Sequence, residues 1–150
     1  MSNYSNHPIR IGIVGYGNLG KGVETELAFH PDMTLVGIFS RRDPQTVDSE
    51  SAVFHMDDLE NMTDQIDVLI LCGGSATDIP EQAPILQKQF TTVNAYDNHT
   101  EIPAHFDVID ALSKTRQNVG DIATGWDPGL FSLNRLVAEA VLPKGDTYTF

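Results

Sequence analysis

The sequence predicts an α/β fold in which helices cover both faces of a doubly wound parallel sheet. Two observations lead to this prediction. Short apolar segments of strand length alternate along the chain with longer segments whose apolar residues recur at helical spacing. One short segment, DVLILC at residues 67–72, is apolar throughout, as expected for a strand that is covered on both faces. Right-handed crossovers between parallel strands then place helices on both sides of the sheet.

The predicted strands are short and rich in β-branched residues. The first, IRIGIVG at residues 9–15, ends in glycine and is typical of a buried strand. Weaker strands are predicted at residues 53–55 (VFH) and 118–124 (NVGDIAT). The complete set spans residues 9–15, 33–40, 53–55, 67–72, 91–96 and 118–124, and DTYTF at the chain end starts a further strand.

The first predicted helix follows the first strand directly. Leu19, Val23 and Leu27 recur at helical spacing, and Pro31 marks the end of the helix. This spacing predicts one apolar face directed toward the sheet.

Three later helices are predicted from spacing and capping signals. Ser75 or Asp78 can cap the helix that follows residues 67–72, and Pro80 fits its first turn. The other two helices span residues 103–117, where Phe106, Ile109 and Leu112 are at helical spacing, and residues 131–142.

Length and composition indicate one domain of ordinary size, with 150 residues of which 41% are hydrophobic. The formal net charge of −12 argues against nucleic acid and anionic membranes as partners, because the global field repels anions. The N-terminus is polar, without a signal peptide, and no apolar run approaches the roughly 20 residues that span a bilayer. A single cysteine cannot form an internal disulfide, so we expect a cytoplasmic protein.

The segment GYGNLG places Gly15, Gly17 and Gly20 in a G-x-G-x-x-G pattern between a predicted strand and a predicted helix. In this context the pattern indicates a dinucleotide-binding turn of the Rossmann fold. The first glycine permits the tight turn, the second lets a pyrophosphate approach the backbone, and the third lets the helix pack close to the sheet. The helix N-terminus adds unpaired N–H groups that attract phosphate. The alternative is an ordinary glycine turn, which this context disfavours.

An unusual basic pair follows the second predicted strand. Ser40 lies 20 positions after Gly20, where an NAD-binding domain typically has an acidic residue, and it is followed by Arg41 and Arg42. A hydroxyl and two guanidinium groups would hold a 2′-phosphate that a carboxylate would repel. We therefore predict NADP as the cofactor. The alternative is a solvated basic loop with a surface pair between Arg42 and Asp43.

The segment LCGGSATDIP supplies a further wall of the predicted cofactor site. Gly73 and Gly74 allow a close backbone approach, and Ser75 and Thr77 offer hydroxyl groups. Cys72 has two interpretations, a nucleophile or a buried strand residue. The buried interpretation is favoured because no basic neighbour in the sequence would lower the pKa of the thiol.

Two aspartates follow the last predicted strands, where the nicotinamide end of the cofactor should lie. Asp97 belongs to YDNH and Asp127 to TGWDPG. Both segments also have turn chemistry, so a turn and a site remain open alternatives. Trp126, the only tryptophan, is either a core residue or a wall of the site. We also count Tyr96 among the cofactor-binding candidates.

The sequence offers no support for other site chemistries. The five histidines lack metal-ligand spacing, and one cysteine does not complete such a site. Neither a nucleophile elbow of the G-x-S-x-G type nor a P-loop is present.

In their order along the chain, VGYGNLG, DMTLVGIFSRR, LCGGSATDIPEQAP, YDNH and TGWDPG resemble the meso-diaminopimelate D-dehydrogenase family from about residue 9 onward. The resemblance implies an NADP-dependent enzyme that deaminates the D-centre of meso-2,6-diaminopimelate to L-2-amino-6-oxopimelate and ammonia, a reversible step of lysine biosynthesis. It also implies a homodimer of two-domain chains.

The resemblance also assigns residues. It places Tyr16, Gly17, Asn18 and Leu19 at the pyrophosphate, Ser40, Arg41 and Arg42 at the 2′-phosphate, and Cys72, Gly73, Gly74 and Ser75 at a further cofactor segment. It implies that Asp97 and Asp127 are acids near the substrate's D-centre, with Trp126 beside them. Which aspartate acts as the base stays open.

We expect the chain to be a fragment of a longer protein, because its last residues look like the start of an unfinished strand. Residues 1–125 are then the NADP-binding domain, and residues 126–150 begin the substrate and dimerisation domain. Such a fragment would have little activity by itself. Two other functions remain open: another two-domain NAD(P)-dependent oxidoreductase acting on a sugar or aldehyde, and a non-catalytic dinucleotide-binding module.

Overall fold

The computed structural model describes residues 7–125, 130–142 and 144. Within these residues the strands are β1 (Ile9–Val14), β2 (Met33–Ser40), β3 (Val53–His55), β4 (Val68–Leu71), β5 (Thr91–Asn94) and β6 (Gly120–Asp121). They form one sheet in the order β3-β2-β1-β4-β5-β6, and every neighbouring pair is parallel. The predicted fold class is therefore confirmed. The strand predicted in DTYTF lies outside the described residues.

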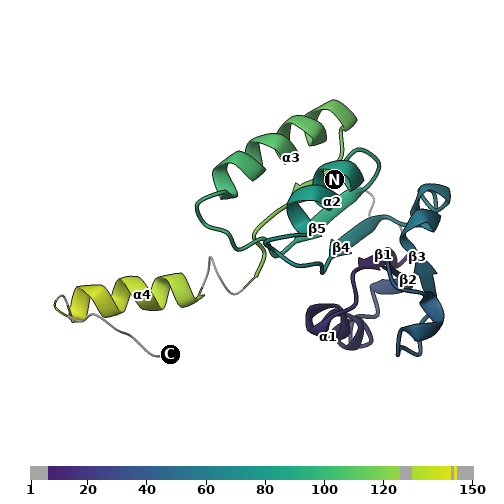
Figure 1. Cartoon of the computed structure of the whole chain (residues 1–150), viewed down its shortest axis with the longest axis horizontal. Helices are drawn as coiled ribbons and strands as arrows, with labels where there is room; N and C mark the ends of the chain where they lie inside the picture. The colour runs from purple at the N-terminus through teal and green to yellow at the C-terminus, as the bar shows by residue number, and fades with distance from the viewer. Residues whose placement is uncertain (1–6, 126–129, 143, 145–150) are drawn as a thin grey trace.

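Helices connect the strands (Figure 1). They are α1 (Asn18–Leu27), α2 (Ile79–Leu86), α3 (Ile102–Arg116) and α4 (Leu130–Val141), with two short 3-10 helices, η1 (Pro44–Thr46) and η2 (Met56–Asn61). The four α-helices were predicted, whereas η1 and η2 were not. No helix in the described part of the chain is long and apolar enough to cross a membrane.

The strand order reverses direction between β1 and β4, which lie side by side at the centre of the sheet. Val14, the last residue of β1, is in register with Phe39 near the end of β2 and with Leu71 at the end of β4. Segments that follow these strands therefore emerge together at one edge of the sheet. In doubly wound folds this point is where ligands bind.

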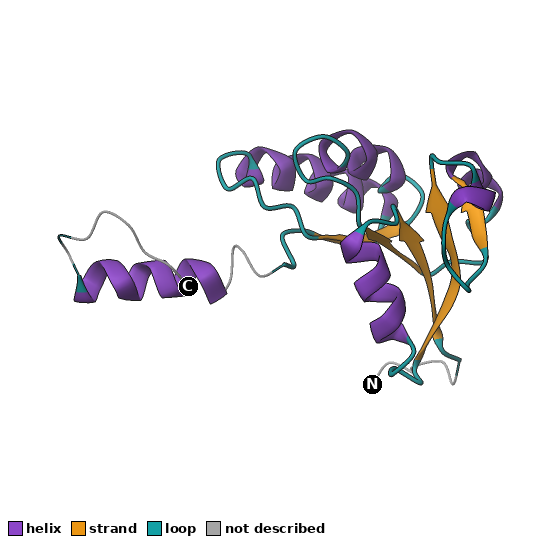
Figure 2. Ribbon diagram, turned by 60° about the horizontal axis from the view of Figure 1, so that its bottom comes forward, coloured by secondary structure: helices purple, strands orange, loops and turns teal. Residues whose placement is uncertain are grey.

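Two hydrophobic clusters fill opposite faces of the sheet, because neighbouring residues of a strand point to opposite sides. Ile13 and Ile38 belong to one cluster, against which Val23 and Leu27 of α1 pack. Val14 and Phe39 belong to the other, together with buried residues of α2 and α3. The views agree that α1 lies across the sheet from α2 and α3 (Figure 1, Figure 2).

The predicted apolar faces of two helices are only partly correct. In α3, Ile109 is buried, but Phe106 is 54% exposed and His105 is buried instead. At about 100° per residue, His105 lies about 40° to one side of Ile109 and Phe106 about 60° to the other, and α3 packs on the sheet with the His105 side. In α1, Leu19 is 47% exposed because it lies at the carboxyl edge of the sheet rather than beneath it.

Helix ends also differ from the predictions. α1 ends at Leu27, before Pro31, because the N–H groups of Phe29 and His30 tighten the last turn with bonds to residues three positions earlier. Pro80 lies in the first turn of α2 as predicted, and Asp78 immediately precedes the helix. The Asp78 side chain makes no capping bond to α2, because its carboxylate is bonded elsewhere.

Candidate functional site

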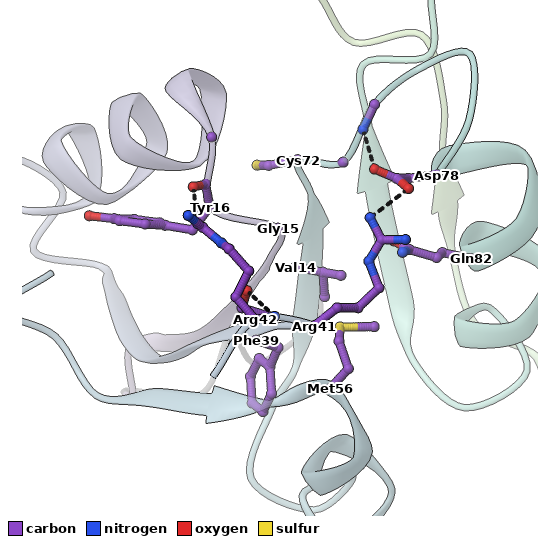
Figure 3. A pocket seen from close by; sticks show the side chains of 14 residues that line it. Val14, Gly15, Tyr16, Phe39, Arg41, Arg42, Met56, Cys72, Asp78 and Gln82 are labelled. Atoms are coloured by element: carbon purple, nitrogen blue, oxygen red, sulfur yellow. Dashed lines mark hydrogen bonds and ion pairs between the residues drawn. The ribbon is translucent and has the colours of Figure 1, made fainter. Parts of the chain in front are cut away.

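The glycine turn, the end of β2 and the segment after β4 surround one cavity of about 370 Å³ at the central carboxyl edge (Figure 3). Nine predicted cofactor-binding residues line it: Gly15, Tyr16, Gly17, Ser40, Arg41, Arg42, Cys72, Gly73 and Gly74. The tertiary structure thus brings together three segments that are widely separated along the chain.

The glycine turn has the geometry of a close approach between main chains. Gly15 has φ +88°, and a Cβ there would lie 3.0 Å from the nitrogen of Gly73. A Cβ at Gly20 would lie 2.4 Å from the carbonyl oxygen of Gly15, so only glycine lets α1 start against the turn. A Cβ at Gly17 would meet nothing within 4 Å. The space above Gly17 is open to a ligand that approaches the first N–H groups of α1, which begins at Asn18.

The two arginines reach opposite walls of the cavity (Figure 3). Arg42 Nη2 donates to the carbonyl oxygen of Tyr16 at 2.7 Å, and the Arg42 N–H donates to Ser40 Oγ at 3.1 Å. Asp43 accepts from the N–H of Gln45. Arg42 and Asp43 therefore have separate partners, in place of the surface pair considered from the sequence.

Arg41 extends to the other wall, where its Nη2 donates to Asp78 Oδ1 at 2.7 Å. The second carboxylate oxygen of Asp78 accepts the N–H of Gly74 at 2.9 Å. The Asp78 side chain is only 19% exposed, whereas that of Arg41 is 67% exposed. A largely buried carboxylate therefore orients an exposed guanidinium over the cavity. From the sequence, Asp78 was predicted only as a possible helix cap. Its position in the chain gave no indication that it pairs with Arg41.

Tyr16 is held from its side chain as well as from its main chain. Its hydroxyl donates to Glu24 Oε2, and the hydroxyls of Ser49 and Ser51 donate to Glu24 Oε1 at 2.7 and 2.5 Å. Burial alone would raise the pKa of Glu24, but the hydroxyls of Ser51, Tyr16 and Ser49 outweigh it, and the pKa lies below its ordinary value. Burial and the Glu24 carboxylate raise the pKa of Tyr16. Sequence reasoning missed Glu24.

Cys72 is 7% exposed at the end of β4, and burial raises the pKa of its thiol to about 12. The buried interpretation of this residue is confirmed, because a thiol with such a pKa remains protonated at neutral pH and is a poor nucleophile.

A second cavity of about 510 Å³ adjoins the first and shares Gly73 with it. Leu19, Ser75 and Asp97 line it, and the N–H of Asp97 donates to Ser75 Oγ at 2.9 Å. Ile79 and Phe131 add apolar walls that the sequence analysis did not single out. Trp126 and Asp127 lie outside the described residues.

Tyr96 occupies a different environment from the other candidates. It is 3% exposed within the core, and its ring centroid lies 4.6 Å from that of His105. Its side chain packs beneath the strand ends and lines neither of the two cavities described above. A cofactor-binding role for Tyr96 stays a prediction. Among the described residues, no group of three His, Cys, Asp or Glu side chains could hold a metal ion.

Comparisons with known proteins point to one group of enzymes. Residues 125–150 match the family model described as the diaminopimelic acid dehydrogenase C-terminal domain. The chain is 56% identical over 144 residues to meso-diaminopimelate D-dehydrogenase of Ureibacillus thermosphaericus. The aligned region covers 95% of this chain and 44% of the relative. The chain thus spans less than half the length of this relative.

Two solved structures of dehydrogenases are also similar to this chain. An engineered D-amino acid dehydrogenase bound to NADP+ is 53% identical, with a TM-score of 0.79, over 91% of this chain and 42% of its own. The Corynebacterium glutamicum DAP dehydrogenase in complex with DAP is also 53% identical, with a TM-score of 0.78, over 90% of this chain and 42% of its own.

Proposed function

We propose that this chain, which resembles the N-terminal part of the meso-diaminopimelate D-dehydrogenases over 95% of its length, is the NADP-binding part of such an enzyme. The whole enzyme would oxidise the D-configured amino carbon of meso-2,6-diaminopimelate. The products would be L-2-amino-6-oxopimelate, ammonia, NADPH and a proton, with one water consumed, and the reaction would be reversible.

One observation carries the proposal. A glycine turn at the strand-order reversal and a Ser40-Arg41-Arg42 segment line the same cavity. In a chain with a net charge of −12, this is a local concentration of positive charge beside a helix N-terminus. A pyrophosphate that carries a separate 2′-phosphate has the charge distribution that such a site fits.

The described residues fit a dinucleotide. The open space at Gly17 admits a pyrophosphate, and the arginines at the end of β2 lie where the 2′-phosphate of the adenosine ribose would be. The second cavity extends toward Asp97 and would hold the nicotinamide end. When bound, NADP supplies the hydride acceptor.

The aspartates account for the remaining chemistry. Asp97 lies beside the second cavity, and Asp127 follows in the chain. Carboxylates there would hold the substrate ammonium and orient its carbon, which is catalysis by positioning. One of them would also accept the proton that leaves the nitrogen before the imine forms.

The proposal also covers the domain organisation and the oligomeric state of the longer protein. Residues 1–125 would form the NADP-binding domain and residues 126–150 the start of a substrate and dimerisation domain. The family model that begins at residue 125 supports this division. We further propose that the longer protein is a cytoplasmic homodimer.

Cofactor preference tests the proposal. We expect the chain to bind NADPH at least about tenfold more tightly than NADH in calorimetric titrations, because only NADPH carries the phosphate that the arginines would contact. The double variant Arg41→Ala/Arg42→Ala should lose that difference and retain its affinity for NADH. Equal affinities of the unchanged chain for both cofactors would overturn the NADP assignment. Ammonia-dependent NADPH consumption by the longer protein tests the reaction.

A further inference from the structure

We propose that Glu24 is a positioning residue that holds the glycine turn and the arginine segment in one arrangement and thereby sustains the preference for NADP over NAD. The inference rests on the proposed function, since it concerns the 2′-phosphate part of the same site. Glu24 touches neither cavity described above. It would act only through the residues that it binds.

Three hydroxyl groups converge on the Glu24 carboxylate from two separate segments. Tyr16 belongs to the glycine turn, and its hydroxyl donates to Oε2. Ser49 and Ser51 belong to the segment between η1 and β3, and both donate to Oε1, at 2.7 and 2.5 Å. The N–H of Ser51 also donates to Ser49 Oγ at 3.0 Å, which orders the two serines relative to each other. One side chain of α1 therefore ties both segments together.

The network continues from Tyr16 to the arginine pair. The Tyr16 hydroxyl is bound by Glu24, while the Tyr16 carbonyl oxygen accepts Arg42 Nη2 at 2.7 Å. The segment from Arg42 to Ser51 is thus attached at its start through Tyr16 and at its end through Glu24. Both attachments meet on the glycine turn and α1. A shift of either would displace the Arg42 guanidinium from the turn that would receive the pyrophosphate.

The charge of Glu24 by itself opposes cofactor binding, because a carboxylate repels phosphate. Its benefit to the site must therefore come from geometry. Three donors satisfy the carboxylate, Tyr16 is only 8% exposed, and the three hydrogen bonds are partly buried. Networks of this kind restrict the conformations of the segments that they join. Such restriction keeps Arg42 in place before the phosphate arrives, and preorganised groups bind more tightly.

The test compares NADPH and NADH affinities of the 150-residue chain by calorimetric titration. Glu24→Ala should lose about tenfold more affinity for NADPH than for NADH, because only NADPH uses the arginine segment. Glu24→Gln, which keeps an acceptor for the serines, should retain most of the preference. Glu26→Ala is the matched control. Glu26 lies on the same helix, is exposed, and pairs with His30 at 3.4 Å, away from the network, so both affinities should be unchanged.

The outcomes separate this inference from the proposed function. The preference of the unchanged chain tests the proposed function, whereas the change of preference in the variants tests Glu24. An equal loss of both affinities in Glu24→Ala would show that Glu24 supports the pyrophosphate turn alone and would overturn the inference. An unchanged ratio would overturn it as well. A chain without any preference for NADPH would overturn both proposals.

Milder variants keep the test valid if Glu24→Ala does not fold. Tyr16→Phe removes the hydroxyl from the network, and Ser49→Ala/Ser51→Ala removes the other two donors. Each should lower the NADPH to NADH preference, and their combination should lower it by less than the product of the separate effects, because both act through Glu24. Independent, multiplicative effects would contradict a shared anchor.

Discussion

Some polar side chains at this site bind main-chain groups of the loops around the cavity. Arg42 binds the carbonyl of Tyr16, and Asp78 binds the N–H of Gly74. The first contact joins the segment after β2 to the turn after β1, whereas the second lies within the loop between β4 and α2. The shape of the cavity therefore depends on a few polar side chains whose loss would change the positions of neighbouring backbone segments.

Gly17 and Gly22 lie five positions apart, and we expect substitutions at the two positions to have different effects. A methyl group at Gly17 meets no protein atom within 4 Å, but it would occupy the space proposed for the pyrophosphate. We expect Gly17→Ala to lower NADPH affinity by at least about tenfold while it leaves the free energy of unfolding within about 0.5 kcal/mol. Calorimetric titration and urea denaturation measure the two quantities.

Gly22→Ala is the matched control for this substitution. Gly22 lies within α1, where a Cβ also meets nothing within 4 Å. Alanine there should raise the free energy of unfolding by about 0.5–1 kcal/mol, because glycine is the poorer helix former, and should leave NADPH binding unchanged. If Gly17→Ala retained full affinity, the proposed path of the pyrophosphate would be wrong.

At the scale of elements, α3 packs on the sheet through a buried polar residue. His105 is 8% exposed, its ring lies against Tyr96, and its Nε2 has no hydrogen-bond partner among the described atoms. Burial lowers the pKa of His105 below its ordinary value of 6.5. The folded state therefore favours the neutral ring, and the unfolded state takes up the proton first as the pH falls.

The lowered pKa of His105 predicts how the free energy of unfolding depends on pH. The contribution of His105 to stability is complete above about pH 6.5 and is lost as the pH falls toward its lowered pKa. Between about pH 7 and pH 5, urea denaturation should show a smaller decrease in unfolding free energy for His105→Phe than for the unchanged chain. The control variant is His30→Gln, at an exposed position of the turn after α1. Its free energy of unfolding should decrease by as much as that of the unchanged chain. Parallel curves for all three proteins would show that His105 makes no such contribution.

At the scale of the whole molecule, α4 differs from the other helices because it lies apart from the sheet (Figure 1, Figure 2). Its large apolar side chains are exposed, and they include Phe131, Leu133, Leu136, Val137 and Val141. An apolar surface of this kind marks an interaction site. We expect it to be covered in the longer protein that we propose.

This exposed surface makes a prediction about the chain in solution. Leu136→Ser/Val137→Ser should reduce self-association in sedimentation velocity, because it removes apolar surface. It should leave the melting temperature of the sheet domain within about 2 °C, because both residues are more than 60% exposed. Glu139→Gln, on the same helix, controls for a surface change without loss of apolar area. A large fall in melting temperature would show instead that α4 stabilises the sheet.

Local pattern was sufficient for many of these features. β2 and β3 have the predicted bounds, since short β-branched runs between turn residues have few other ways to be buried. The glycine turn was likewise readable, because its three glycines have local steric causes, two of which the structure shows directly. The last strand was the hardest to predict: residues 118–124 were expected, but β6 contains only Gly120–Asp121. An edge strand needs little apolar pattern of its own, so its bounds are poorly marked in the sequence.

The alternation of strands and helices, the turn at Gly15 and the basic pair after β2 could be predicted, because each depends on residues close together in the chain. The side chains that complete the site become apparent only once the chain is folded. Arg41 meets Asp78 37 positions away, and Glu24 meets Ser49 and Ser51 25 and 27 positions away. Parallel strands gather distant segments at one edge of the sheet, and hydrogen bonds across that edge leave no periodic trace in the sequence.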